Sequence, residues 1–100
     1  MSAKITSSGL IYKNQPLTVK ITNTKNLSDI GDHFTIRIKS PTWSAVEIAT
    51  VSDDDLSISA DFDGGILKAG VVEIQGFCYV TEKDENPIPF EKVIVNINDY

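Results

Sequence analysis

The sequence predicts an all-β fold, an immunoglobulin-like antiparallel β-sandwich of about seven strands. Several segments alternate apolar and polar residues with a period of two, which is typical of strands that bury one face. Turn-forming residues separate these segments about every 8 to 15 residues, as in a sandwich of short strands. Of the 100 residues, 41% are hydrophobic and 23% charged, as in an ordinary globular domain. We therefore expect one domain over residues 1–100, with residues 1–9 as an extended N-terminal arm.

Three segments predict strands with one apolar and one polar face. The alternation is clearest in Leu17–Thr22, His33–Lys39 and residues 56–62. Within the last segment, Ile58 lies on the apolar face and Ser57 on the opposite one. We expect Ile58 in the core and Ser57 in contact with solvent.

Two further strands are expected in the C-terminal part of the chain. Between residues 71 and 81 both faces carry apolar side chains, which indicates a central strand, and Gly76 within it suggests a bulge. Residues 92–98 alternate and predict a closing strand, in which Ile94 stands alone on the face opposite the other apolar residues.

Two more segments carry mixed or weaker signals. Residues 44–51 begin with Ser44 and Glu47, which fit a helix capping box, but the segment is rich in β-branched residues, so a strand is favoured. Residues 9–13 predict a first strand that ends before Pro16, which lacks the amide donor of a central strand.

Composition and residue counts argue against several functional classes. The net charge of -5 disfavours binding to nucleic acid, and the apolar runs fall short of the roughly 20 residues that cross a bilayer. With one histidine, His33, and one cysteine, Cys78, neither a hydrolytic triad nor a zinc site can be assembled. No G-x-G-x-x-G or phosphate-loop pattern occurs. We expect no enzymatic activity, cofactor or small-molecule substrate.

Two acidic turns raise the possibility of calcium binding. Residues 61–64 begin like a calcium loop, but the later ligand positions fall on Gly65, Leu67 and Val72, which offer no carboxylate. Residues 53–55 are three consecutive aspartates, which fit a solvated turn as well as a loose calcium site. Solvated turns are favoured at both places, and no metal site is assigned.

Four apolar residues are candidates for partner binding. Phe77 and Tyr79 lie on the second face of the strand expected between residues 71 and 81, and Val71 shares that face. Trp43 follows a proline, where it could either cap the core or extend the same patch. Aromatic residues are enriched in protein interfaces, although a neighbouring loop could equally bury this face.

A series of segments between residues 34 and 97 carries a family resemblance. The alternating residues 56–62 precede Leu67 and Gly70, which lead into a long strand over residues 67–77; a polar hairpin at residues 82–86 then precedes the last strand. This order resembles the N-terminal immunoglobulin-like domains of baseplate and tail-fibre proteins of tailed bacteriophages. The resemblance implies docking through loops and sheet edges, without enzymatic activity.

We therefore expect a non-enzymatic structural or adaptor protein of a bacteriophage virion, associated with the tail, baseplate or capsid. Its expected partners are other virion proteins, in multiple copies. No Sec-type leader follows Lys4, so synthesis in the host cytoplasm and residence in the virion are expected. Two alternatives stay open: an adhesion-type sandwich that binds calcium or carbohydrate, and a small acidic intracellular inhibitor.

Overall fold

The fold was analysed in a computed structural model that describes residues 12–23, 26–80, 87–90 and 92–99. Eight strands and two short 3-10 helices make up the described elements, and no α-helix occurs among them. In chain order they are β1 (Leu17–Thr22), η1 (Leu27–Asp29), β2 (His33–Lys39), β3 (Ser44–Ile48), β4 (Thr50–Val51), β5 (Ser57–Phe62), η2 (Gly64–Ile66), β6 (Gly70–Tyr79), β7 (Ile88–Pro89) and β8 (Val93–Ile97).

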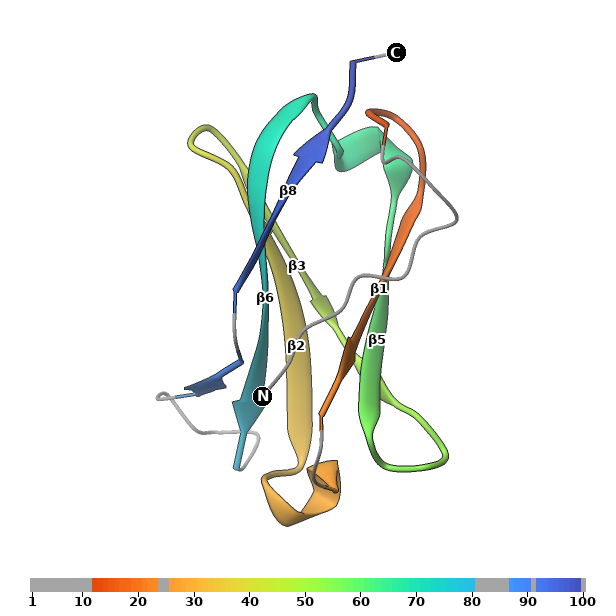
Figure 1. The fold of residues 1–100 in the computed structure, drawn as a ribbon, viewed down its shortest axis with the longest axis vertical. Coiled ribbons are helices and arrows are strands. Elements are labelled where there is room, and N and C mark those ends of the chain that lie inside the picture. The colour runs from red at the N-terminus through yellow and green to blue at the C-terminus, as the bar shows by residue number, and fades with distance from the viewer. Residues whose placement is uncertain (1–11, 24–25, 81–86, 91, 100) are drawn as a thin grey trace.

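The strands form two antiparallel sheets that face each other (Figure 1). The three-stranded sheet has the order β1-β5-β4. The five-stranded sheet has the order β3-β2-β6, and β7 and β8 both pair with the far side of β6. This arrangement confirms the predicted all-β antiparallel sandwich.

The core lies between the two sheets and is built by the alternation seen in the sequence. In β1 every second side chain is buried, beginning with Leu17, and the residues between are exposed. Ile58 is fully buried in β5, as expected. A buried aliphatic or aromatic side chain contributes about 1.5–3 kcal/mol relative to exposure. The other members of the buried cluster are Leu17, Val19, Ile21, Leu27, Phe34, Ile36, Ile38, Ala60, Phe62, Leu67, Val72, Ile74, Cys78, Phe90 and Ile97.

The segment of residues 44–51 is extended, so the preference for strand over helix was right. The chain changes sheets at Ala49: β3 pairs with β2, whereas β4 pairs with β5 of the other sheet. The Ala49 amide donates to the carbonyl of Phe34 over 2.9 Å and holds the crossing point against the five-stranded sheet. This division into two strands explains part of the difference between seven expected and eight observed strands.

The bulge expected at Gly76 is absent from β6. The ladder between β2 and β6 runs in constant register from His33↔Tyr79 to Lys39↔Glu73. Gly76 instead permits close packing of the sheets, because a Cβ there would lie 2.8 Å from Cδ1 of Ile21. The register changes on the other side of β6. There Pro89 pairs with Phe77, and Val93 pairs with Ile74. The chain advances four residues between these pairs while β6 advances three, so the extra residue belongs to the segment that joins β7 to β8 and not to β6.

The expectation that Ser57 is solvated is wrong. Its side chain is only 4% exposed, and its hydroxyl lies 3.1 Å from that of Thr22 on the paired strand. The backbone amide of Ser57 donates to the nearby Oγ of Ser52 over 3.1 Å. Alternation predicted a solvent-exposed side chain at this position, but the Ser57 hydroxyl is buried and has a hydrogen-bond partner.

The expected first strand, residues 9–13, lies largely outside the described residues, as do the arm of residues 1–9 and the hairpin of residues 82–86. Within the described part, Tyr12 forms an isolated parallel bridge with Asn98. The Lys13 amide donates to the Asn98 carbonyl over 3.0 Å, and the Lys13 ammonium lies 2.6 Å from a carboxylate oxygen of Asp99. These contacts place the chain before β1 alongside the end of β8.

Candidate functional site

The candidate site is the outer face of the five-stranded sheet, the side turned away from the core. The ladders place every second residue of β2, β3, β6 and β8 on this face. We define the outer face by His33, Thr35, Arg37, Lys39, Ser44, Val46, Ile48, Val71, Glu73, Gln75, Phe77, Tyr79, Ile94 and Asn96. It includes several exposed large apolar side chains of the described chain, with exposed fractions of 84% for Ile48, 68% for Ile94, 60% for Val71 and 56% for Val46.

The centre of the outer face is an arginine stacked on an aromatic ring. The Arg37 guanidinium carbon lies 4.9 Å from the centroid of the Phe77 ring, a cation–π contact between neighbouring strands. Nη2 of Arg37 lies 3.4 Å from Oε1 of Gln75, whose Nε2 donates to the Phe90 carbonyl over 2.8 Å. These contacts hold Phe77 half-buried beneath a positive charge, instead of leaving its ring face open to solvent.

Two polar atoms near this centre are buried without hydrogen-bond partners. They are Oγ1 of Thr35 and Nε of Arg37. Such atoms are uncommon in folded proteins, and each carries a desolvation cost. Their position beside Phe77 shows that the centre of the outer face is already shielded from water in the single chain.

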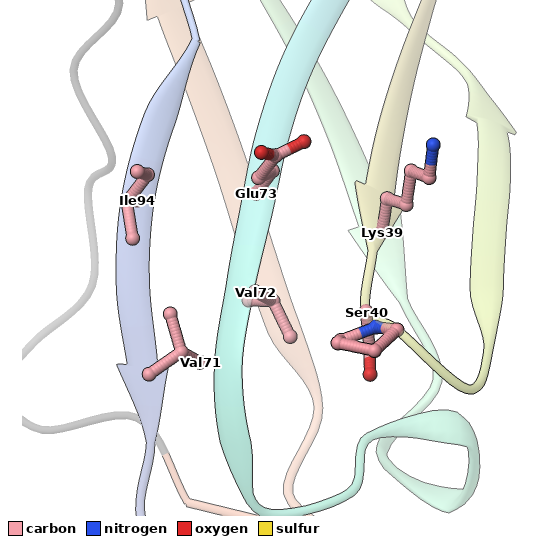
Figure 2. A pocket seen from close by; sticks show the side chains of 7 residues that line it. Lys39, Ser40, Val71, Val72, Glu73 and Ile94 are labelled. Carbon is pink, nitrogen blue, oxygen red and sulfur yellow. The ribbon is translucent and has the colours of Figure 1, made fainter.

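One end of the outer face carries a groove of about 340 Å³ (Figure 2). In Figure 2, Ile94 from β8 and Lys39 from β2 flank Val71 and Glu73 of β6. The ladders agree, because Glu73 pairs with Lys39 on one side and with Ile94 on the other. The groove therefore combines an apolar wall from Val71 and Ile94 with one residue of each charge.

A second hollow of about 250 Å³ lies at the opposite end of the sheet. Its lining includes Tyr79, Ile48, Thr35 and His33. His33 pairs with Tyr79 at the start of β2, and its side chain is exposed. An aromatic ring, an aliphatic side chain and an imidazole thus contribute to the lining of this hollow.

The structure brings three of the four predicted partner-binding residues to one face. Val71, Phe77 and Tyr79 all lie on the outer side of β6, although Val71 is about 20 Å from Phe77 at the rise of a β-strand. Trp43 is not brought to them. It is half-buried and packs against the core, and its carbonyl accepts the Ser40 amide over 2.8 Å in the turn between β2 and β3.

Sequence reasoning did not select three exposed residues of the outer face as candidates for partner binding. Val46 and Ile48 belong to β3, and Ile94 belongs to β8. The position of Ile94 on the opposite face of its strand was visible from alternation. The two β3 residues could be found only by knowing that this strand lies at the sheet edge, where its even-numbered side chains have no covering layer.

The aspartates of residues 53–55 form internal turn contacts. The Asp55 carboxylate accepts the Ser28 amide over 3.1 Å and the Ser28 hydroxyl, and the Asp54 carboxylate accepts the Leu56 amide over 3.1 Å and the Ser52 hydroxyl. The bond from Ser52 is the main cause that lowers the pKa of Asp54, and the bond from Ser28 does the same for the pKa of Asp55. The Asp55 carboxylate thus ties the β4–β5 turn to η1, whereas the Asp54 carboxylate closes the turn itself.

The other acidic turn is also closed locally, since Oδ1 of Asp63 accepts the Gly65 amide over 3.1 Å. Within residues 12–23, 26–80, 87–90 and 92–99, no group of three or more histidine, cysteine or acidic side chains is arranged to hold a metal ion. The same described residues include no helix long and apolar enough to cross a membrane.

Comparison with known proteins adds no family to this description. No protein-family model, no curated protein and no solved structure matches the chain.

Proposed function

We propose that this protein acts by protein–protein association through the outer face of the five-stranded sheet, as a non-enzymatic structural or adaptor protein. The observation that carries the proposal is the set of exposed apolar side chains on that face: Val46 and Ile48 on β3, beside the Arg37–Phe77 pair, and Val71 and Ile94 at the groove. Tyrosine, phenylalanine and arginine are enriched in protein interfaces, and lysine is depleted. Lys39 is the only lysine among the residues that define the outer face.

Folding of the single chain does not require the exposed apolar side chains of the outer face. Val46, Ile48, Val71 and Ile94 retain more than half of their accessible surface, so they contribute little to the stability of the single chain. Isolated exposed aliphatic residues are common, whereas a set of them on one face marks a binding surface. Contact with a partner would bury these side chains without rearrangement of the sheet.

The virion setting of this proposal rests on the resemblance described above. The strand order supports an immunoglobulin-like assignment: β1-β5-β4 corresponds to strands B-E-D, and β3-β2-β6-β8 corresponds to C′-C-F-G. We place the protein in the tail, baseplate or capsid-associated part of a bacteriophage particle, where its partners are other virion proteins in multiple copies.

The proposal is tested by incorporation of the tagged chain into purified phage particles. We expect the wild-type chain to remain with particles through density-gradient purification. Tyr79→Ser should reduce its recovery at least about tenfold, because aromatic anchors dominate interface energies. Phe77→Ser should also reduce recovery, because it removes the ring on which Arg37 is held at the centre of the outer face. Lys20→Ser, on the exposed side of the three-stranded sheet, is the control and should be recovered like the wild type.

Circular dichroism melts of each purified variant accompany this assay. The proposal requires that Tyr79→Ser and Phe77→Ser remain folded while recovery falls. Absence of the wild-type chain from particles would overturn the virion setting. Equal recovery of folded Tyr79→Ser and wild type would overturn the role of the outer face.

A further inference from the structure

Within the part of the chain that the structure describes, the edge of the five-stranded sheet formed by β3 has a row of backbone groups without a partner strand. In an antiparallel ladder, residues alternate between those whose amide and carbonyl both face the partner strand and those that face away. The Ala49 amide bonds to Phe34 and the Ser40 amide bonds to Trp43, in register with the β2–β3 ladder. Residues 43, 45, 47 and 49 therefore face β2, and Ser44, Val46 and Ile48 direct their amides and carbonyls outward.

This edge carries few of the features with which proteins usually protect exposed strands. Those features are charged residues, above all lysine, together with proline, bulges, inward-pointing charges and very short length; of these, β3 has only the charge of Glu47. The five residues of β3 include no lysine or proline, and their register with β2 is regular. By contrast, β1 carries Lys20, β7 carries Pro89, and β4 has only two residues. The strand β8 also has no lysine or proline, but Tyr12 and Lys13 lie alongside its end at Asn98. The side chains beside the free β3 groups are the exposed Val46 and Ile48.

We propose that two copies of the chain associate by antiparallel pairing of their β3 edges about a two-fold axis at Val46. The inference deepens the proposed association function, on which it rests, by assigning a second copy to this edge. The two five-stranded sheets would become one continuous sheet. Isologous pairing of this kind uses the same patch on both subunits and closes the assembly at a dimer.

The strand itself selects this register. A residue whose backbone amide and carbonyl point away from β2 must pair with another such residue of the second copy. This condition allows three registers, in which the two-fold axis passes at Ala45, at Val46 or at Glu47. Centring on Glu47 would oppose two like charges, which destabilises a cross-strand pair. Centring on either Ala45 or Glu47 also aligns only three residues of β3 with the partner strand. The Val46 axis aligns all five.

The side chains are compatible with the Val46 axis. Val46 of the two copies meet at the centre, and Ser44 of each copy lies opposite Ile48 of the other, which covers the apolar residues. On the other side of the strand, Glu47 lies opposite Ala45, so no like charges are paired. Three outward residues per strand form three hydrogen-bonded pairs with two backbone bonds each.

Sedimentation velocity of the purified full chain over a range of concentrations tests the proposal. We expect a concentration-dependent dimer. Val46→Lys should raise its dissociation constant at least about tenfold, because it removes the central apolar contact and opposes two ammonium groups. Val71→Lys is the matched control, since Val71 is also on the outer face and 60% exposed, against 56% for Val46. It should dimerise like the wild type.

A charge-exchange experiment tests the axis. Val46→Glu alone should also be monomeric, whereas an equal mixture of Val46→Lys and Val46→Glu should form a heterodimer, because opposite charges then meet at the axis. Circular dichroism melts should show that both variants remain folded, since Val46 lies outside the core. A wild-type chain that stays monomeric would overturn the proposal, as would a Val46→Lys chain that still dimerises or a mixture that gains no heterodimer.

These results are separable from the particle assay. If the wild-type chain is absent from particles but dimerises through Val46, the virion setting fails and the β3 pairing stands. If Tyr79→Ser loses particle incorporation and the wild type never dimerises, the outer-face function stands and the β3 pairing is overturned.

Discussion

The two outer surfaces of this sandwich differ in chemistry although they cover the same core. On the three-stranded sheet the exposed side chains include Thr18, Lys20 and Asp61, and the Thr18 hydroxyl donates to the Asp61 carboxylate over 2.6 Å. On the five-stranded sheet the corresponding positions include Val46 and Ile48. One sheet thus shows the apolar-in, polar-out pattern of a solvated antiparallel sheet, and the other departs from it.

The difference separates what folding requires from what it leaves free. The inner side of each sheet must be apolar because the core is buried there. Nothing in the folding of the single chain requires apolar residues on the outer side of β3. The departure is therefore informative about association, whereas the buried apolar residues report only on stability.

The largest expected effect contrasts an inner with an outer isoleucine. Ile58→Ala should reduce the free energy of unfolding by about 2–5 kcal/mol, because Ile58 is fully buried and truncation leaves a cavity. Ile48→Ala should cost under about 0.5 kcal/mol in dilute solution, since Ile48 is 84% exposed. Urea unfolding followed by circular dichroism measures both. Similar losses would mean that the outer face is part of the core after all.

Much of the fold could be predicted because period-two alternation reports directly on one buried face. It placed the strands that became β1, β2 and β5 and assigned Ile58 to the core. Gly76 shows the limit of such reasoning. A glycine within a strand can mark a bulge or a close approach of the backbone, and only the position of Ile21 on the opposite sheet decides for close approach here.

The candidate site was less predictable for a related reason. The outer position of Phe77 and Tyr79 followed from the parity of their strand, but Trp43 packs against the core because the turn before β3 points its side chain inward. Phe90 was not singled out, since it follows a proline-rich turn. Its ring nevertheless packs edge-on against Phe34, with centroids 6.5 Å apart. Such contacts depend on which loop covers which sheet.

A smaller effect is expected at the buried hydroxyl pair of the three-stranded sheet, which sharpens the contrast between the two sheets. Ser57→Ala should reduce stability by about 0.5–1.5 kcal/mol, because it removes the contact with Thr22 from a side chain only 4% exposed. Ser59→Ala, two residues along the same strand and half-buried, should cost under about 0.5 kcal/mol. Differential scanning calorimetry of both variants would detect the difference. Equal melting temperatures of the two variants would mean that the Ser57 hydroxyl contributes no more to stability than a solvated one.

The smallest expected effect is a dependence of stability on pH that originates at Asp55, in the β4–β5 turn of the three-stranded sheet. Hydrogen bonds from Ser28 hold the pKa of Asp55 below its ordinary value of 3.8 in the folded chain. The unfolded chain therefore takes up a proton at higher pH than the folded one. The stability from this group is fully present above 3.8 and declines as the pH falls through the lower folded value. Asp55→Asn should flatten the acid limb of a plot of melting temperature against pH, because the amide does not titrate. Asp53→Asn is the control and should keep the wild-type slope. A wild-type slope in Asp55→Asn as well would show that the Ser28 contact contributes nothing to acid stability. The β4–β5 turn would then resemble the solvated surface beside it.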